Sequence, residues 1–111
     1  MRYDMKLNNG PFESIKNGTK TIELRLNDEK RQLLKVNDII IFTNRDTGEK
    51  LSALIINLHY FDSFKELYNH FDKTMLGYSK NEECSYMDME EYYSIEEQKK
   101  YGVVGIEIKK L

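Results

Sequence analysis

Residues 18–26 read Gly18-Thr19-Lys20-Thr21-Ile22-Glu23-Leu24-Arg25-Leu26, and this stretch decides the fold of the chain. Apolar and polar side chains alternate along it, and a period of two is typical of a β-strand. One face carries Ile22, Leu24 and Leu26, and the other carries Thr21, Glu23 and Arg25. Lys20 stands at the entrance of the strand. The stretch therefore predicts a strand whose polar face holds a carboxylate and a guanidinium two residues apart.

Two interpretations of this polar face are open. Glu23 and Arg25 are suited to form a ligand cradle with Lys20, or they form a solvated ion pair worth about 0–1 kcal/mol. Two chemical roles are open for Lys20. It is either a fixed cation that contacts a phosphate or a carbonyl, or a base or nucleophile whose pKa is lowered by loss of solvent. Glu23 nearby favours the charged amine, and hence the binding role.

The flanking residues predict how this strand is entered. Residues 3–7 form a short possible strand, and Gly10-Pro11 predicts the start of a helix, because proline suits the first helical turn. Gly18 is well placed to end that helix in the left-handed conformation. Lys20 therefore follows a constrained turn between helix and strand, and this turn fixes the direction of its amine.

The remaining elements follow from similar signals. The run Ile39–Thr43 predicts a strand buried on both faces, and a loop over residues 44–48 predicts an antiparallel hairpin with a long strand over residues 51–60. Ser63-x-x-Glu66 and Ser94-x-x-Glu97 are capping boxes that open two further helices. Residues 103–108 predict a terminal strand that pairs centrally in the sheet.

About five strands and three helices that do not alternate regularly exclude a doubly wound parallel sheet. We therefore expect an α+β fold, with a small, mostly antiparallel β-pseudo-barrel and helices at its periphery. A chain of 111 residues supports one domain over residues 1–111.

Composition limits the function. The formal net charge is −2, whereas proteins that bind nucleic acids without specificity are usually basic. Any RNA contact should then use a local pocket that engages one or two phosphates. One cysteine, Cys84, excludes an internal disulfide, and His59 and His70 have no metal-ligand spacing, so we expect no metal and no cofactor. No signal-like or membrane-spanning run is present, which predicts a soluble protein of the cytoplasm.

The segment 73–88 shows no clear period. Irregular segments of this length are uncommon in small domains and often form lids or binding loops. A flexible surface loop is the equally weighted alternative.

The motif Gly18-x-Lys20-x-x-Glu23-x-Arg25 is similar to the G-x-K-x-x-E-x-R signature of the ASCH domains, which belong to the PUA-like superfamily of RNA-binding modules. Residues 11–17 resemble the short helix of this family, residues 34–42 its LKxGD strand, and residues 92–106 its C-terminal region. Asn37 stands where the family usually has glycine, and asparagine tolerates a left-handed turn. The resemblance covers nearly the whole chain and implies the PUA-like pseudo-barrel.

The resemblance also implies an enzymatic alternative. A bacterial branch of the superfamily removes the acetyl group from N4-acetylcytidine with a lysine, a threonine and a glutamate. The lysine matches Lys20, and Glu91 is the best spaced match for the glutamate. Glu23 occupies the position of the threonine, for which Thr21 is the only substitute on the same strand face.

Three functions are therefore considered. The first is binding of RNA or a nucleotide-like ligand in a cleft lined by Lys20, Glu23 and Arg25, with Tyr92 or Tyr93 as a stacking surface or as core residues. The second is an amidohydrolase that uses Lys20 and Glu91. The third is a protein-interaction module with a relict pocket. The oligomeric state is not predicted.

Overall fold

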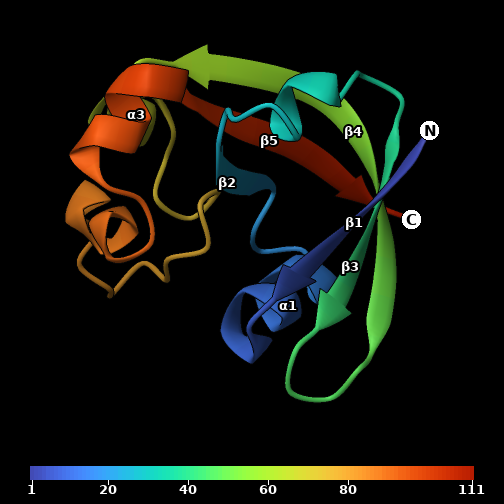
Figure 1. Cartoon of the computed structure of the whole chain (residues 1–111). Helices are drawn as coiled ribbons and strands as arrows, with labels where there is room; N and C mark the ends of the chain where they lie inside the picture. Colours follow the sequence, from blue (N-terminus) through green and yellow to red (C-terminus); the bar gives the residue numbers. More distant parts are fainter.

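The computed structural model describes all 111 residues, and its centre is one five-stranded sheet with the strand order β1-β3-β4-β5-β2 (Figure 1). The strands are β1 (Arg2–Leu7), β2 (Ile22–Leu26), β3 (Ile39–Asn44), β4 (Lys50–Phe61) and β5 (Val103–Lys110). The α-helices are α1 (Asn9–Lys16), α2 (Phe64–His70) and α3 (Ile95–Tyr101), and the short 3₁₀ helices are η1 (Arg31–Leu33) and η2 (Tyr86–Glu91).

The sheet is mostly antiparallel and curls into a half-barrel. Only β1 and β3 run parallel, whereas the pairs β3–β4, β4–β5 and β5–β2 are antiparallel. The edge strands β1 and β2 share no ladder of backbone hydrogen bonds, so the barrel has an open seam between them. The predicted α+β class and the central place of β5 are confirmed.

A first core fills the inside of the half-barrel. It unites residues from four strands, from α1 and from the turn before β3. Its buried members are Met5, Leu7, Phe12, Ile15, Leu34, Ile40, Phe42, Ala53, Ile55, Val104, Ile106 and Ile108. Helix α1 closes one end of the half-barrel by inserting Phe12 and Ile15 into this core.

A second core lies on the outer side of β2 and β5, beneath α2. Its buried members are Ile22, Leu24, Leu26, Phe64, Leu67, Leu76 and Val103. Gly105 permits the close approach of helix and sheet, because a Cβ there would lie 3.3–3.4 Å from Ile22, Phe71 and Leu67. The apolar face of β2 therefore packs outward against α2 rather than into the half-barrel.

Two details of the sequence-based prediction are wrong. The strand β3 is not buried on both faces: Ile40 and Phe42 are buried, but Ile39 and Ile41 are only half-buried, since no helix covers the outer face there. Helix α1 begins at Asn9 rather than at Pro11, and Pro11 still falls in the first turn, where its missing N–H has no helical partner to lose.

The turns at Gly18 and Asn37 use a left-handed backbone. Gly18 ends α1 with a φ of 87°, as predicted, and Asn37 has a φ of 78° in the turn before β3. Asparagine adopts this conformation more easily than most residues. The turn at Asn37 therefore forms despite the absence of glycine.

Candidate functional site

The charged face of β2 points into the half-barrel. Glu23 lies opposite Ile106 and Arg25 lies opposite Val104 in the β2–β5 ladder, and both of these β5 residues belong to the inner core. Glu23 is only 3% exposed and Lys20 only 9% exposed. The interpretation of this face as a solvated ion pair is therefore wrong, because the half-barrel and the segments around it enclose the charges.

Glu23 holds two cations at once. Its Oε1 lies 3.1 Å from Nζ of Lys20, and its Oε2 accepts a hydrogen bond from Nε of Arg25 at 2.9 Å and lies 2.8 Å from Nη2 of the same guanidinium. This charge-assisted contact fixes the orientation of the guanidinium. Three charged groups, two of them cations, form one cluster that carries a formal excess of one positive charge.

The electrostatics keep Glu23 and Arg25 ionised. Burial by itself raises the pKa of the Glu23 carboxyl, but Lys20 and Arg25 outweigh it and hold that pKa below its ordinary value. Burial likewise disfavours the charged Arg25, but Glu23, with a smaller contribution from Tyr93, raises the pKa of its guanidinium. Removal of Glu23 would leave two cations together with no counter-charge.

Arg25 also connects the two edges of the sheet. Its Nη2 donates a hydrogen bond to the backbone carbonyl of Lys6 in β1, at 3.2 Å. The two edge strands meet here through a side chain instead of a backbone ladder. Arg25 therefore closes the seam of the half-barrel at the point where the charged cluster lies.

A cleft opens along this seam, and we call it the seam cleft. It has a volume of about 230 Å³. It is lined by Lys6, Leu7, Asn8, Pro11, Lys20, Glu23, Leu24, Arg25, Arg45, Met89, Tyr92 and Tyr93. Four of these side chains are cationic and one is a carboxylate, so the seam cleft is locally positive in a chain of net charge −2.

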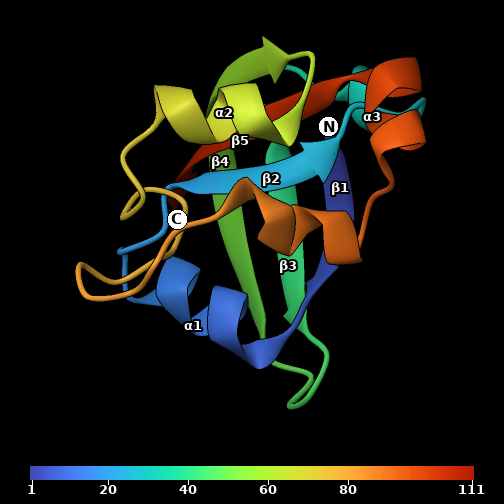
Figure 2. The same ribbon diagram turned by 90° about the vertical axis from the view of Figure 1, so that its left-hand side faces the viewer.

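A larger cavity of about 600 Å³, the main cavity, adjoins the seam cleft and shares with it Pro11, Lys20, Leu24, Met89 and Tyr92. Its far wall comes from η2 and from the segment before η2, which Figure 2 shows in orange in front of β2 and above α1. This wall is acidic: Glu82, Asp88 and Glu91 line it. Of these two neighbouring spaces, the seam cleft is therefore cationic, whereas the main cavity has an acidic wall.

The two candidate tyrosines have different environments. The ring of Tyr93 stacks on the buried Phe64, with 5.5 Å between the centroids and 24° between the planes, so this ring packs in the outer core. Tyr92 is 63% exposed and lines both the seam cleft and the main cavity. Tyr92 is therefore the aromatic ring that is free to stack on a ligand.

The segment 73–88 is tied to β2. The backbone N–H groups of Thr21 and Ile22 both donate to the carbonyl of Met75, each at 3.0 Å. A Cβ on Gly77 would lie 3.1 Å from Cδ of Lys20, so this glycine lets the chain pass directly over the Lys20 side chain. These contacts tie the segment to β2, and its Leu76, Gly77, Tyr78 and Glu82 line the main cavity, so the segment is not a free surface loop.

A hydrogen-bonded chain orders the acidic wall. The Tyr68 and Tyr78 hydroxyls lie 2.8 Å apart, and the Tyr78 hydroxyl donates to Oδ2 of Asp88 at 2.8 Å. Burial raises the pKa of Tyr68 to about 12, and burial and its two partners raise the pKa of Tyr78 further. Both phenols therefore stay protonated, and Asp88 is held in one position.

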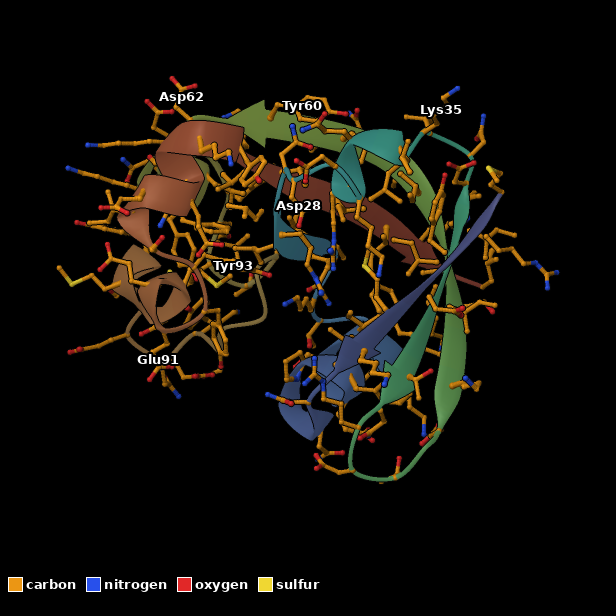
Figure 3. All side chains as sticks on the ribbon, viewed as in Figure 1. Asp28, Lys35, Tyr60, Asp62, Glu91 and Tyr93 are labelled. Atoms are coloured by element: carbon orange, nitrogen blue, oxygen red, sulfur yellow. The ribbon has the colours of Figure 1, made fainter.

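The residues proposed for the enzymatic alternative are only partly brought together. Lys20 and Glu91 line the main cavity, and Figure 3 labels Glu91 on the η2 side of the molecule, with Tyr93 toward β2. Thr21 lines neither the main cavity nor the seam cleft, and its buried Oγ1 has no hydrogen-bond partner. Thr21 is thus not placed to assist Lys20 and Glu91.

No sequence pattern marks Lys6 and Arg45 as lining residues of the seam cleft. Lys6 is an ordinary exposed lysine in a short strand, and Arg45 lies in the hairpin loop after β3. Only the parallel pairing of β1 with β3 brings their backbones together, since the Arg45 N–H donates to the Leu7 carbonyl at 2.9 Å. No helix of the structure is long and apolar enough to span a membrane.

Comparisons with known proteins agree with this architecture. A family model described as the ASCH domain matches residues 5–111. The crystal structure of the hypothetical protein PH0355 has 35% sequence identity and a TM-score of 0.85, and the match covers all of both chains. The solution structure of protein PF0455 from Pyrococcus furiosus has 33% identity and a TM-score of 0.78, with coverage of all of this chain and 98% of the other.

No curated protein matches the chain. The structural relatives carry no assigned activity in their names, so they support the fold and not a reaction. The family match spans nearly the whole chain, and the two solved structures share its half-barrel fold. The chain belongs to the ASCH domain family.

Proposed function

We propose that this protein binds RNA or a nucleotide-like ligand in the seam cleft, with a phosphate at the cations and a base against Tyr92. The observation that carries the proposal is the buried cluster of Lys20, Glu23 and Arg25 on the floor of a cleft. Buried charges are rare unless they are paired, and this cluster leaves one positive charge without a counter-charge. A ligand anion would supply it.

The chemistry of the two cations suits a phosphate. Lys20 has three N–H donors and only one partner within the chain, Glu23. Arg25 is already oriented by Glu23, so less side-chain entropy is lost when it binds. Lys6 and Arg45 add positive charge at the mouth of the same cleft. These features favour an anionic group over a neutral one.

The aromatic part of the ligand is assigned to the side of Tyr92. Unpaired bases stack on exposed aromatic rings, and such contacts contribute about 1–3 kcal/mol per base. Tyr92 borders both spaces, so a base stacked on it would extend toward the main cavity. The volume of the main cavity, about 600 Å³, lies in the range of ordinary small-molecule sites.

Calorimetric titration with nucleoside monophosphates and with the matching nucleosides tests this proposal. We expect nucleotides to bind and nucleosides to bind at least tenfold more weakly, since they lack the phosphate. Arg25→Ala and Tyr92→Ala should each weaken nucleotide binding, whereas Tyr60→Ala, at an exposed tyrosine that lines neither space, should not. Equal binding of nucleotide and nucleoside would contradict the placement of the phosphate.

The second candidate is the amidohydrolase, and the observation in its favour is that Lys20 and Glu91 line one cavity. A lysine that acts as a base or nucleophile must first lose its proton. Here the amine pairs with Glu23 at 3.1 Å, and the threonine role is unfilled. Binding is therefore the better supported of the two functions, and protein interaction through a relict pocket has no observation of its own.

The amidohydrolase is tested with N4-acetylcytidine at high enzyme concentration. If Lys20 acts chemically, Lys20→Arg should abolish turnover and leave affinity largely intact, because arginine keeps the charge but does not deprotonate. If Lys20 only binds, the same change should weaken affinity modestly. Absence of acetate release by the unmodified protein would remove this candidate and leave the binding proposal standing.

A further inference from the structure

We propose that the ligand is a strand of single-stranded RNA that leaves the seam cleft past Lys20 and continues along a second, basic surface. We call this surface the basic track and define it by Arg2, Lys16, Lys50, Lys109 and Lys110. The inference rests on the proposed function and extends it, because it distinguishes a strand from a free nucleotide.

Two hollows that share lining residues lie between the seam cleft and the track. A hollow of about 350 Å³ is lined by Lys20, Lys109 and Lys110. A second hollow, of about 620 Å³, is bordered by Lys110 and by Arg2, Lys16 and Lys50. Lys20 thus lines both the seam cleft and the first hollow, and Lys110 lines both the first hollow and the second.

Few acidic groups interrupt this path. The only acidic side chains that line the two hollows are those of Glu49 and Glu107. Each has a partner: Glu49 lies 2.7 Å from Nζ of Lys16, and Glu107 lies 2.9 Å from Nε2 of His59. The five cations of the track therefore outnumber its acids in a chain whose net charge is negative.

The main cavity, unlike the track, is unfavourable for a polyanion. Glu82, Asp88 and Glu91 line the main cavity on the side of η2, and their charges repel phosphates. A base can enter that space, but the backbone of a strand is directed away from it. The charge distribution thus favours a path past Lys20 toward Lys109 and Lys110 over a path along η2.

The ammonium groups of the track are placed by weak contacts. Nζ of Lys110 donates to the Lys16 carbonyl at 2.9 Å, and Nζ of Lys50 donates to Oγ1 of Thr43 at 3.0 Å. Each ammonium has three donors, so these contacts leave donors for a phosphate. The exposed pair of Lys16 with Glu49 contributes about 0–1 kcal/mol and is easily exchanged for a phosphate contact.

Fluorescence anisotropy with a ribonucleotide hexamer, together with calorimetry of the mononucleotide, tests the inference. A hexamer suits the scale, because small single-strand-binding domains cover about 4–16 nucleotides. The track variant carries Lys50→Gln, Lys109→Gln and Lys110→Gln. The matched control carries Lys30→Gln, Lys35→Gln and Lys99→Gln, which remove the same charge from exposed lysines outside both hollows and the cleft.

We expect the hexamer to bind more tightly than the mononucleotide. Its log affinity should fall more steeply with log salt, by about 0.7 for each additional phosphate engaged. At low salt the track variant should lose about tenfold or more in hexamer affinity, keep its mononucleotide affinity, and lose the additional slope. The control variant should keep most of the hexamer affinity.

The two levels of the proposal fail in different ways. If the mononucleotide binds and the hexamer gains nothing, or if the track and control variants lose hexamer affinity equally, the basic track is wrong and the seam cleft stands. If neither the mononucleotide nor the hexamer binds, the proposed function fails and the track fails with it.

Discussion

At the scale of the residue, Glu23 determines the electrostatics of the site. It is the only carboxylate in the seam cleft, and it pairs with both Lys20 and Arg25. Its contribution differs from that of a surface ion pair, because the loss of one partner leaves buried charge unpaired. The stability of the fold and the charge of the site therefore depend on the same side chain.

Glu23→Gln should lower the free energy of unfolding by about 3 kcal/mol at neutral pH, because Lys20 and Arg25 then lie close together without a counter-charge. Urea denaturation measures this. Glu49→Gln removes a carboxylate whose pair with Lys16 is exposed, and it should cost less than about 1 kcal/mol. Equal losses for the two variants would show that burial adds nothing to the Glu23 pairs.

The same carboxylate predicts a loss of stability in acid. The pKa of Glu23 is lower in the folded chain than its ordinary value of 4.5, so the unfolded chain takes up this proton first. The stabilisation is fully present above that ordinary value and is lost as the pH falls below it, through the folded pKa. Denaturation between about pH 7 and pH 3 should show a shallower acid loss in Glu23→Gln than in the unmodified protein.

At the scale of the element, the loop after α2 and the strand β2 form one unit. The Met75 carbonyl accepts from two β2 N–H groups, and Gly77 passes over Lys20 with a φ of 104°. A side chain at Gly77 would be strained and would also press on Cδ of Lys20. The position of the Lys20 amine thus depends on a residue more than fifty positions away.

Gly77→Ala should destabilise the protein by about 1–2 kcal/mol, because alanine is strained at positive φ, and it should also weaken nucleotide binding by displacing Lys20. Gly48→Ala is the matched control, since Gly48 has a φ of 76° with nothing within 4 Å of a Cβ. Gly48→Ala should cost similar stability and leave binding unchanged. Equal binding losses in both variants would contradict a direct effect on Lys20.

The sequence predicted the positions of the helices and strands better than it predicted which of their faces are buried. The alternation in β2, the left-handed turn at Gly18 and the central place of β5 follow from local patterns that the structure keeps. The direction of the two faces of β2 does not follow, because periodicity separates the faces without saying which is inside. Burial of the charged face needs partners such as Lys6 and η2, which are remote in sequence.

At the scale of the whole molecule, the sheet separates two cores. Phe42 lies in the inner core and Leu67 in the outer core beneath α2, and both are fully buried. The two cores share the wall formed by β2 and β5, and no buried side chain belongs to both. The molecule therefore has two hydrophobic contributions to stability that lie on opposite faces of one sheet.

Phe42→Ala should lower the free energy of unfolding by about 3–5 kcal/mol and Leu67→Ala by about 2–5 kcal/mol, because each leaves a cavity in a packed core. The losses should add in the double variant to within about 0.5 kcal/mol, as expected for sites without shared partners. Chemical denaturation of the two single variants and of the double variant checks this. A clear departure from additivity would mean that the sheet transmits strain between the cores.

The hydrogen bond from Arg25 to the Lys6 carbonyl closes the seam reversibly, because a ligand can compete for the same Arg25 donor. A phosphate that accepts a hydrogen bond from Nη2 of Arg25 would replace the Lys6 carbonyl as its partner. That carbonyl can then bond to water, because Lys6 is exposed. The two edges of the sheet can then part without disturbing either core. Ligand binding in the cleft would thus increase the local opening of the half-barrel at its edges. Faster hydrogen exchange of the backbone amides of β1 and β2 would report this opening.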